Sequence, residues 1–234
     1  MKAGIIAADG TRGSRTAQET SILADVLPQL AVDLGFIVLA YLAGSLPMGV
    51  IVARLTGGRD PRTVGSGRTG GTNAWRAMGA WRAVAVAVLD VLKGFVPVAT
   101  ASLLGASSLG VALSGVAAVV GAWSSIFLRF HGGRGVATGI GAALFVQPLA
   151  VLLAAPVFFG TILLTRYVSL GSLLATAAGT VIIGLFVLLG WNDWPAFLFA
   201  VMGAAIVWIA HHDNVGRLLR GEERRFDIFW RGKN

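Results

Sequence analysis

Long runs of apolar residues without any charged side chain dominate the chain. The charge-free runs are Leu34–Ala53, Phe95–Leu128, Gly135–Thr165, Tyr167–Asn192 and Trp194–Ala210. A helix that crosses a bilayer needs about 20 mainly apolar residues. The pattern therefore predicts an all-α fold, a polytopic transmembrane helix bundle.

Five spans are predicted from these runs and the turns between them. They cover roughly Val26–Leu55, Ala83–Leu104, Leu109–Leu128, Ser172–Leu189 and Trp194–Ala210. The second span includes two ionisable residues, Asp90 and Lys93. Small residues are frequent in all of them, and such residues allow helices to pack closely in lipid.

The composition agrees with a membrane protein and excludes several other classes. Apolar residues make up 56% of the chain and charged residues 13%, about half the charged share of a soluble domain. The net charge is +8, but the basic residues flank apolar runs, which fits lipid headgroups or a phosphorylated substrate and not nucleic acid. The chain has no cysteine, which excludes disulfides and thiolate chemistry.

The chain divides into three parts by composition. Residues 1–25 are polar and lack the apolar centre of a secretory signal, so we expect a flexible N-terminal tail there. We expect residues 26–212 to form the transmembrane domain and residues 213–234 to form a basic cytoplasmic C-terminal tail.

The basic residues predict the orientation. Six arginines lie in the loop Arg54–Arg82, two (Arg129 and Arg134) follow the third span, and more follow Ala210, whereas the turns near Ser107 and Asp193 carry no positive charge. Because positively charged loops stay in the cytoplasm, we expect the N-terminus outside, the C-terminus inside, and an odd number of crossings.

The region from Gly135 to Thr165 decides the number of spans. Two crossings here give seven in all and keep Arg166 on the basic side, with Gln147 and Pro148 as the break. The first of them, about Gly135–Val146, would measure only about 18 Å, so it needs local thinning of the bilayer or burial in protein. We expect about seven spans, one of them short, and a five-span arrangement is the alternative.

The first polar stretches with candidate chemistry are the turn Gly44–Pro47 and the segment Gly65–Asn73. Glycines let backbone N–H groups converge on an anion, while hydroxyls and an amide add donors. Arg62 and Arg68 can add charge and paired hydrogen bonds. The same composition also fits a flexible loop, and the segment lacks the ending of a Walker loop.

A second glycine-rich stretch, His131–Gly139, opens the short apolar run. A glycine turn before a helix N-terminus presents free N–H groups and the positive end of the helix dipole, both suited to phosphate. Arg134 adds a full charge. The alternative is a basic topology anchor with turn glycines.

Two further stretches follow later spans. In Arg166–Ser172, two hydroxyls three residues apart lie beside an arginine, although a helix cap explains them as well. In His211–Glu223, His211 and Asn214 share one helix face, and a histidine can move protons or be merely solvated. His211 and Asp213 make a poor metal pair, and we predict no metal site.

Asp90 and Lys93 lie three residues apart within a predicted span. They can pair, which lowers the cost of placing each charge in lipid. A functional role and a packing role are both open for this pair. A hydrolase triad is not supported, because the chain has no Gly-x-Ser-x-Gly elbow.

Taken in order, six segments resemble the bacterial acyl-phosphate:glycerol-3-phosphate acyltransferase family. The segments are Gly44–Pro47, Gly65–Asn73, Asp90–Gly94, Gly132–Thr138, Arg166–Ser172 and His211–Glu223. The similarity runs over most of the chain. Arg68 stands where the family usually has Asn, and Gly71 where it has Ala. Arg134 replaces the usual Lys, which keeps the charge but changes the geometry of phosphate binding.

The resemblance implies a seven-span enzyme of the cytoplasmic membrane. Such an enzyme moves an acyl group from acyl-phosphate to the sn-1 hydroxyl of glycerol 3-phosphate, giving lysophosphatidic acid and phosphate, the first acylation of phospholipid synthesis. It uses neither acyl-CoA nor a metal, so we expect no cofactor. The rival hypotheses are a transporter for a phosphorylated solute and a membrane scaffold.

On this basis we assign roles to the residues of the six segments. The catalytic candidates are His211, Asn214 and Ser45. The candidates for phosphate binding are Arg62, Ser66, Gly67, Thr72, Asn73, Gly132, Gly133, Arg134, Gly135, Arg166, Ser169 and Ser172. Asp90, Lys93 and Glu222 are expected to be structural. We expect direct attack by the glycerol hydroxyl, with the proton going to His211 or to a substrate phosphate.

Overall fold

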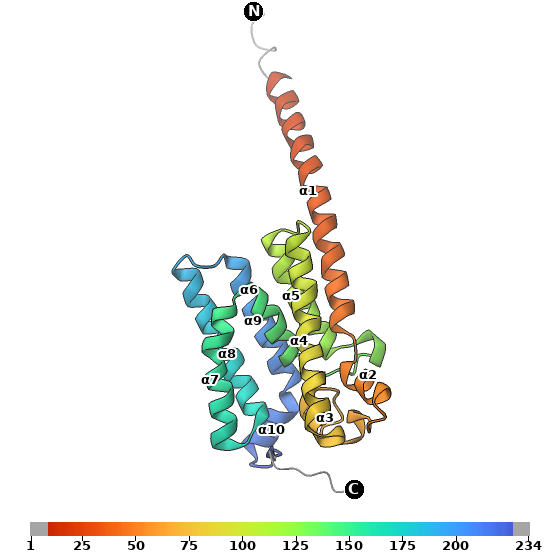
Figure 1. Cartoon of the computed structure of the whole chain (residues 1–234). Coiled ribbons are helices and arrows are strands. Elements are labelled where there is room, and N and C mark those ends of the chain that lie inside the picture. The colour runs from red at the N-terminus through yellow and green to blue at the C-terminus, as the bar shows by residue number, and fades with distance from the viewer. Residues whose placement is uncertain (1–8, 227–234) are drawn as a thin grey trace, which may run out of the picture.

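The computed structural model describes residues 9–226, with side chains from Val26 onward, as a bundle of helices (Figure 1). No β-strand occurs within that range, so the predicted all-α fold is confirmed. The helices are α1 (Asp9–Gly44), α2 (Met48–Leu55), α3 (Gly71–Met78), α4 (Ala80–Leu103), α5 (Ser108–Trp123), α6 (Val136–Val146), α7 (Pro148–Thr165), α8 (Val168–Leu188), α9 (Trp194–Ala210) and α10 (His212–Leu219). Two short 3₁₀ turns cover Pro61–Thr63 and Ile126–Leu128.

Four of the predicted spans agree with helices α4, α5, α8 and α9 to within a few residues, except that the third ends in a 3₁₀ turn. Within the described range, five helices are long and apolar enough to cross a membrane, and the bent pair α9–α10 makes a sixth if it counts as one span. The total of seven crossings and the orientation of the two termini stay predictions.

The predicted first span, Val26–Leu55, is wrong at its C-terminal end. Helix α1 stops at Gly44, and the separate helix α2 begins at Met48. Pro47 explains the break, because its ring disfavours the helical conformation of the preceding residue and suits the start of a new helix. At its other end α1 is already helical at Asp9, within the predicted tail. The division of the chain at residues 25 and 213 stays a prediction.

The short helix α6 has the position predicted for the short span. It has 11 residues and a length of about 16 Å. It ends at Val146, and Gln147 separates it from Pro148, the first residue of α7. The side chain of Gln147 donates to Asn192 in the turn between α8 and α9. Asn192 in turn donates to the carbonyl oxygen of Val146 at 3.5 Å. This turn therefore provides hydrogen-bond partners at the C-terminal end of α6.

Glycines let two helix pairs approach until their backbones touch. A Cβ atom at Gly94 of α4 would collide with the carbonyl oxygen of Thr138 in α6, and one at Gly141 would collide with that of Val91. Helices α1 and α5 meet in the same way, at Gly44 and Gly121. The predicted close packing through small residues is therefore confirmed for these pairs.

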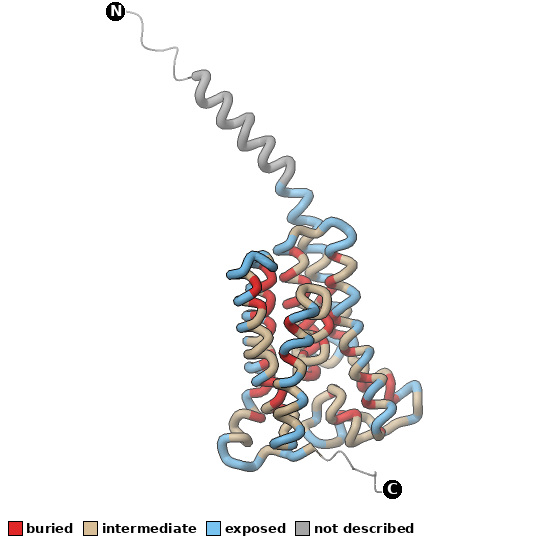
Figure 2. Tube along the Cα trace, turned by 60° about the vertical axis from the view of Figure 1, so that its left-hand side comes forward, coloured by how far each residue is buried: buried red, intermediate tan, exposed pale blue. Residues whose placement is uncertain are grey.

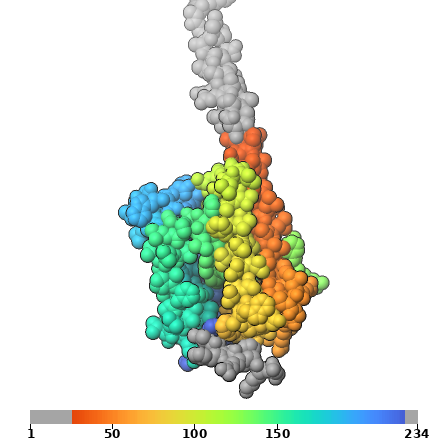
Figure 3. Space-filling model, viewed as in Figure 1, coloured from red at the N-terminus to blue at the C-terminus, as the bar shows by residue number. Residues whose placement is uncertain are grey.

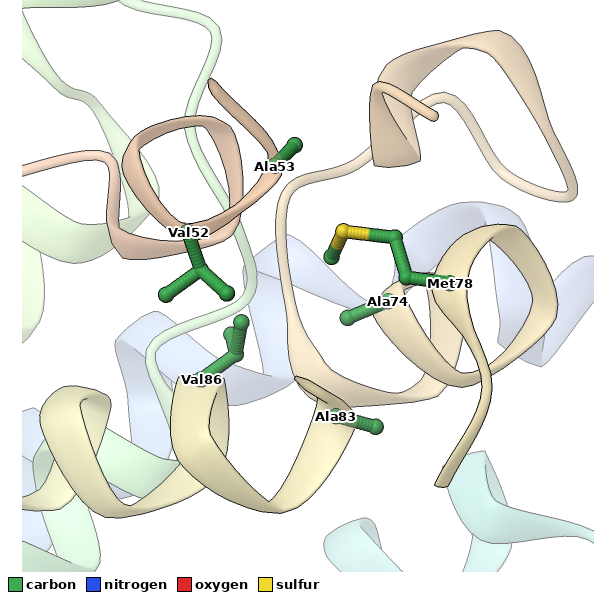
Figure 4. Close-up of a cluster of buried hydrophobic side chains, with 6 residues drawn as sticks. All are labelled: Val52, Ala53, Ala74, Met78, Ala83 and Val86. Atoms are coloured by element: carbon green, nitrogen blue, oxygen red, sulfur yellow. The ribbon is translucent and has the colours of Figure 1, made fainter. Parts of the chain in front are cut away.

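A small apolar core fixes helix α3 at one end of the bundle. Val52 and Ala53 of α2, Ala74 and Met78 of α3, and Ala83 and Val86 of α4 pack together (Figure 4). This end also carries α10, whereas α1 extends beyond the opposite end (Figure 1). Buried residues follow the inner faces of the helices through the bundle (Figure 2). The glycine-rich segments before α3 and α6 and the end of α9 thus come together.

Candidate active site

A cavity of about 650 Å³ opens where α3, α4, α6, α7, α8 and α10 meet. Six cationic side chains line it, Arg68, Arg76, Lys93, Arg134, Arg217 and Arg224, against two carboxylates, Asp90 and Glu223. Between α4 and α7 this face of the molecule is recessed (Figure 3). Val84, Phe159 and Leu163 line the cavity there and are 58%, 61% and 72% exposed. The cavity therefore joins a cationic interior to a side opening lined by exposed apolar side chains.

The first glycine-rich segment is folded around Asn73. The side-chain amide of Asn73 donates to the hydroxyl of Ser66 at 3.0 Å and to the carbonyl oxygen of Arg68 at 2.9 Å. Its oxygen accepts from Arg76 at 3.2 Å. Gly65 has a φ of +58°, and a Cβ there would lie 2.5 Å from the Asn73 side chain, so glycine is required. Asn73, predicted to bind phosphate, has its donors occupied by the segment itself.

The second glycine-rich segment differs from its predicted form. The N–H groups of Gly132 and Gly133 already donate to the carbonyl oxygens of Trp123 and Ala122, at 2.9 and 2.7 Å. These two N–H groups are therefore not free for a phosphate, contrary to our expectation. The donors that remain lie one turn later, where Gly135 caps α6 with a φ of +76° and the start of that helix lines the cavity.

Arg134 projects into the cavity beside α10. One guanidinium nitrogen lies 3.3 Å from Asp213, and the side chain is 19% exposed. Its Nε–H is buried without a hydrogen-bond partner in the described part of the chain. Burial lowers the pKa of Arg134; Asp213 opposes this shift, and Arg68 and Arg217 add to it. A buried cation with an unused donor is prepared for an anionic ligand.

Arg68 links the two glycine-rich segments. Its guanidinium lies 3.5 and 3.4 Å from the carbonyl oxygens of Gly132 and Gly133. Among the described residues no carboxylate pairs with it. At the other side of the cavity Arg76 lies close to Arg224, so that burial first and then Arg224 lower the pKa of Arg76. The cavity thus contains two groups of cations, Arg68 with Arg134 and Arg76 with Arg224.

His211 lies just after the end of α9 and is 2% exposed. Its Nδ1 lies 2.7 Å from the carbonyl oxygen of Val207, so Nδ1 must carry the proton and donate. Burial lowers the pKa of His211 to about 4, although the bond to Val207 opposes the shift. The ring is therefore neutral near pH 7, and Nε2 is left as a proton acceptor.

Asn214 lies one turn after His211 on the same face, as predicted. Its amide nitrogen donates to Glu223 at 2.6 Å, while its oxygen is buried without a partner in the described residues. Glu223 also accepts from Ser169 at 3.0 Å and from Arg217 at 2.8 Å. Glu223 therefore holds together three groups from two helices around the cavity.

Asp213, next to Asn214, pairs with Arg134 and Arg217, at 3.3 and 3.2 Å. Burial alone would raise the pKa of Asp213, but the two arginines outweigh burial and lower it. Asp213 thus stays ionised and orients Arg134 toward the cavity.

The predicted pair of Asp90 and Lys93 is confirmed, with 2.8 Å between Oδ1 and Nζ. Lys93 also donates to the carbonyl oxygen of Leu46 at 3.0 Å. This bond holds the break between α1 and α2 against α4. Both residues line the cavity, so the pair is structural in its contacts and adjoins the site.

Most of the predicted site residues come together in this cavity. Lining it are Ser66, Thr72, Asn73, Gly133, Arg134, Gly135, Ser169, Ser172, His211 and Asn214. The hydroxyl of Ser172, however, donates to the carbonyl oxygen of Val168 in its own helix. Gly67 and Gly132 do not line the cavity, although their neighbours do.

Four predicted residues lie elsewhere. Ser45 is 1% exposed and packs against Gly121 of α5, outside the cavity lining. Arg62 forms an exposed pair with Asp60 at 2.7 Å. Arg166 contacts the backbone of Phe226. The structural carboxylate is Glu223, with 6% of its side chain exposed, and not Glu222, whose side chain is 59% exposed and pairs with Arg220.

Three cavity residues were not predicted from the sequence: Arg76, Arg217 and Glu223. Each arginine follows a chosen asparagine by three residues, Asn73 and Asn214, and therefore lies on the same helix face. That spacing is the signal that would have found them. Trp75 also lines the cavity, with a buried indole N–H that has no partner among the described residues and an edge contact to Phe226.

Comparison with known proteins identifies the family of the chain. The sequence profile of the family described as glycerol-3-phosphate acyltransferase matches residues 34–221. The chain belongs to this family. A glycerol-3-phosphate acyltransferase of Thermus thermophilus is 46% identical over 191 residues, covering 81% of this chain and 92% of the relative. That of Geobacter sulfurreducens is 43% identical over 187 residues, covering 80% of this chain and 94% of the relative.

Two crystal structures have the same fold. Both are of PlsY (YgiH), an integral membrane glycerol 3-phosphate acyltransferase. The glycerol 3-phosphate form has a TM-score of 0.76 and 37% identity, covering 83% of this chain and 96% of its own. The lysophosphatidic acid form has a TM-score of 0.74 and 34% identity, covering 83% and 95%. The family resemblance and the helical membrane fold predicted from the sequence are thereby confirmed.

Proposed function

We propose that this chain transfers an acyl group from an acyl-phosphate to the sn-1 hydroxyl of glycerol 3-phosphate, releasing phosphate and lysophosphatidic acid. Two observations support the acceptor and product: the relatives are glycerol-3-phosphate acyltransferases, and the related structures carry glycerol 3-phosphate and lysophosphatidic acid in their names. The rival transporter and scaffold hypotheses have no comparable support.

The observation that carries the proposal is a neutral, buried His211 beside two groups of cations. Each substrate brings one phosphate, and each cation group suits one. An acyl-phosphate already has a good leaving group, so the enzyme needs mainly to position the two substrates and stabilise charge. The excess of cations over carboxylates in the cavity suits two phosphorylated substrates.

The residues suggest a single displacement. The glycerol oxygen attacks the acyl carbon and forms the new ester bond, while the bond from the acyl carbon to the phosphate oxygen breaks. His211 Nε2, or a substrate phosphate, takes the hydroxyl proton. Arg134 and the first N–H groups of α6 neutralise the departing phosphate. Glu223 positions Asn214 and Arg217, and no covalent acyl-enzyme is formed.

The location follows from the distribution of charge. We assign the chain to the bacterial cytoplasmic (inner) membrane as a multi-pass protein, with the cavity facing the cytoplasm. The arginines between Arg54 and Arg82, together with Arg217 of α10, support this orientation. Glycerol 3-phosphate then enters from the cytoplasm, and the donor enters sideways from the bilayer between α4 and α7.

The test is turnover by purified protein in nanodiscs with palmitoyl phosphate and labelled glycerol 3-phosphate. We expect labelled lysophosphatidic acid and one phosphate released per product, and none with palmitoyl-CoA. Absence of product from folded protein would refute the proposal. A trapped acyl ester on Ser45 or Ser66 would refute direct transfer.

The variant His211→Gln tests the proton acceptor. We expect turnover to fall by roughly a hundredfold or more, because glutamine cannot accept the proton. The matched control is His212→Gln, since His212 is adjacent and exposed, and it should keep its activity. Full turnover by His211→Gln at normal protein levels would assign the proton to a substrate phosphate instead.

A further inference from the structure

Beyond the cationic cavity, an apolar space of about 280 Å³ continues between α6, α7, α8 and α9. We propose that this space, here called the slot, measures the acyl chain of the donor: its closed end sets the longest chain that the enzyme uses. The inference rests on the proposed function. It goes further by naming the residues that determine chain length.

The slot is continuous with the site. Val136, Ile140, Phe158, Phe159 and Ser172 line both spaces, so a molecule with its head at His211 can extend into the slot. A molecule that fills both must have an anionic head and a long apolar tail. The acyl donor and the lysophosphatidic acid product are both of this kind.

The slot has a defined depth. Along α8 its lining runs from Ser172 to Ile183, a rise of about 16 Å. On α9 it runs from Val207, whose carbonyl oxygen holds His211, to Phe199. A tail that begins at the reacting carbonyl therefore lies along these two helices with its end near Ile183 and Phe199.

The far end of the slot is closed by side chains. Ala150, Ile183 and Phe199 are 1%, 3% and 3% exposed, and Phe186 and Ala196 pack behind Ala150 and Ile183. A longer chain would have to displace packed side chains, because interiors of this kind have little free space. These packed side chains therefore form a physical limit at the far end of the slot.

The glycines of the slot leave room and do not bring helices together. A Cβ at Gly179 would make an ordinary contact of 3.9 Å with Ala154, and one at Gly203 a contact of 3.8 Å with Phe199. This contrasts with Gly94 and Gly141, where a Cβ would collide with backbone. Larger residues at Gly179 would thus fill the slot at little cost to helix packing.

The test compares turnover of lauroyl, palmitoyl and stearoyl phosphate by the full chain in nanodiscs. Gly179→Val should lower kcat/KM for palmitoyl relative to lauroyl phosphate, by about fourfold for each methylene excluded from the slot. Ile183→Ala should raise stearoyl relative to palmitoyl phosphate severalfold. The control is Gly160→Val on α7, where a Cβ would meet nothing within 4 Å and which does not line the slot.

The possible outcomes separate the inference from the proposed function. A change of chain preference in opposite directions in Gly179→Val and Ile183→Ala, with Gly160→Val unchanged, supports the slot as the determinant. Equal loss at every chain length in Gly179→Val, or unchanged ratios in both variants, overturns it while leaving the donor intact. If the wild-type protein uses no acyl-phosphate at all, the proposed function fails instead.

Discussion

The cationic cavity and the slot differ in how their polar groups are satisfied. In the slot, the hydroxyls of Ser172, Thr176 and Thr180 each donate to a carbonyl oxygen one turn back in α8. In the cavity, Arg134 and Asn214 keep buried polar atoms without partners in the described residues. Because a buried, unpaired polar atom is costly, the difference separates an inert wall from a surface that awaits a ligand.

Among variants that test this contrast between the cavity and the slot, the largest loss of turnover is expected at Glu223. Glu223→Ala removes the acceptor for Ser169, Asn214 and Arg217, and breaking a buried charge pair is strongly unfavourable. We expect turnover to fall roughly a hundredfold for donors of every chain length, measured as kcat with palmitoyl and lauroyl phosphate. Glu223→Asp should recover part of it.

The matched control is the neighbouring Glu222→Ala. Glu222 is exposed and pairs only with Arg220 among the described residues, and exposed pairs contribute little. Its turnover should stay within about twofold of wild type. Equal losses in the two variants would show that the cavity is not organised by Glu223.

A smaller effect is expected at Arg68. Arg68→Asn restores the residue that the family pattern has at this position, so the enzyme should stay active. The variant removes one cation from the group with Arg134, and we expect KM for glycerol 3-phosphate to rise about fivefold with little change in kcat. Arg59→Asn, in the exposed loop, serves as the control. An unchanged KM would separate Arg68 from phosphate binding.

The smallest effect on kcat is expected from a change of pH. Since the pKa of His211 is lowered from 6.5 to about 4, the neutral ring persists as pH falls below 6.5, and kcat should show no step there. As the pH falls from 6.5 to about 4, His211 takes up a proton in the unfolded chain but not in the folded one. The free energy of unfolding should therefore decrease over this range as the pH falls. A step in kcat near pH 6.5 that is absent from His211→Gln would contradict a His211 ring that stays neutral.

The positions of most helices could be predicted from the sequence, but not all of the residues at which they end. The segments that form the site could also be predicted, but not the hydrogen bonds between them. Apolar runs predicted α9 without error, and Pro148 revealed the start of α7, because proline is favoured in the first turn of a helix. Pro47 carries the same signal, but the apolar pattern continues through it. That continuity concealed the end of α1 at Gly44.

Within the site, spacing along a helix predicts which residues share a helix face, but it does not predict their hydrogen-bond partners in other segments. His211 and Asn214 were found because both lie on one face. The N–H groups of Gly132 and Gly133 are taken up by carbonyl oxygens at the end of α5, and no local pattern reveals such a tertiary contact. The burial of Glu223 in place of Glu222 likewise depends on how the chain crosses the cavity after α10.

The short helix α6 has a consequence for the membrane itself. At about 16 Å, α6 and the slot beside it reach through only about half of the hydrocarbon core, which is about 30 Å thick. On the proposed function, the tail of the donor and that of the product therefore belong to a single leaflet. In the proposed orientation, each turnover would add its new lipid to that leaflet alone.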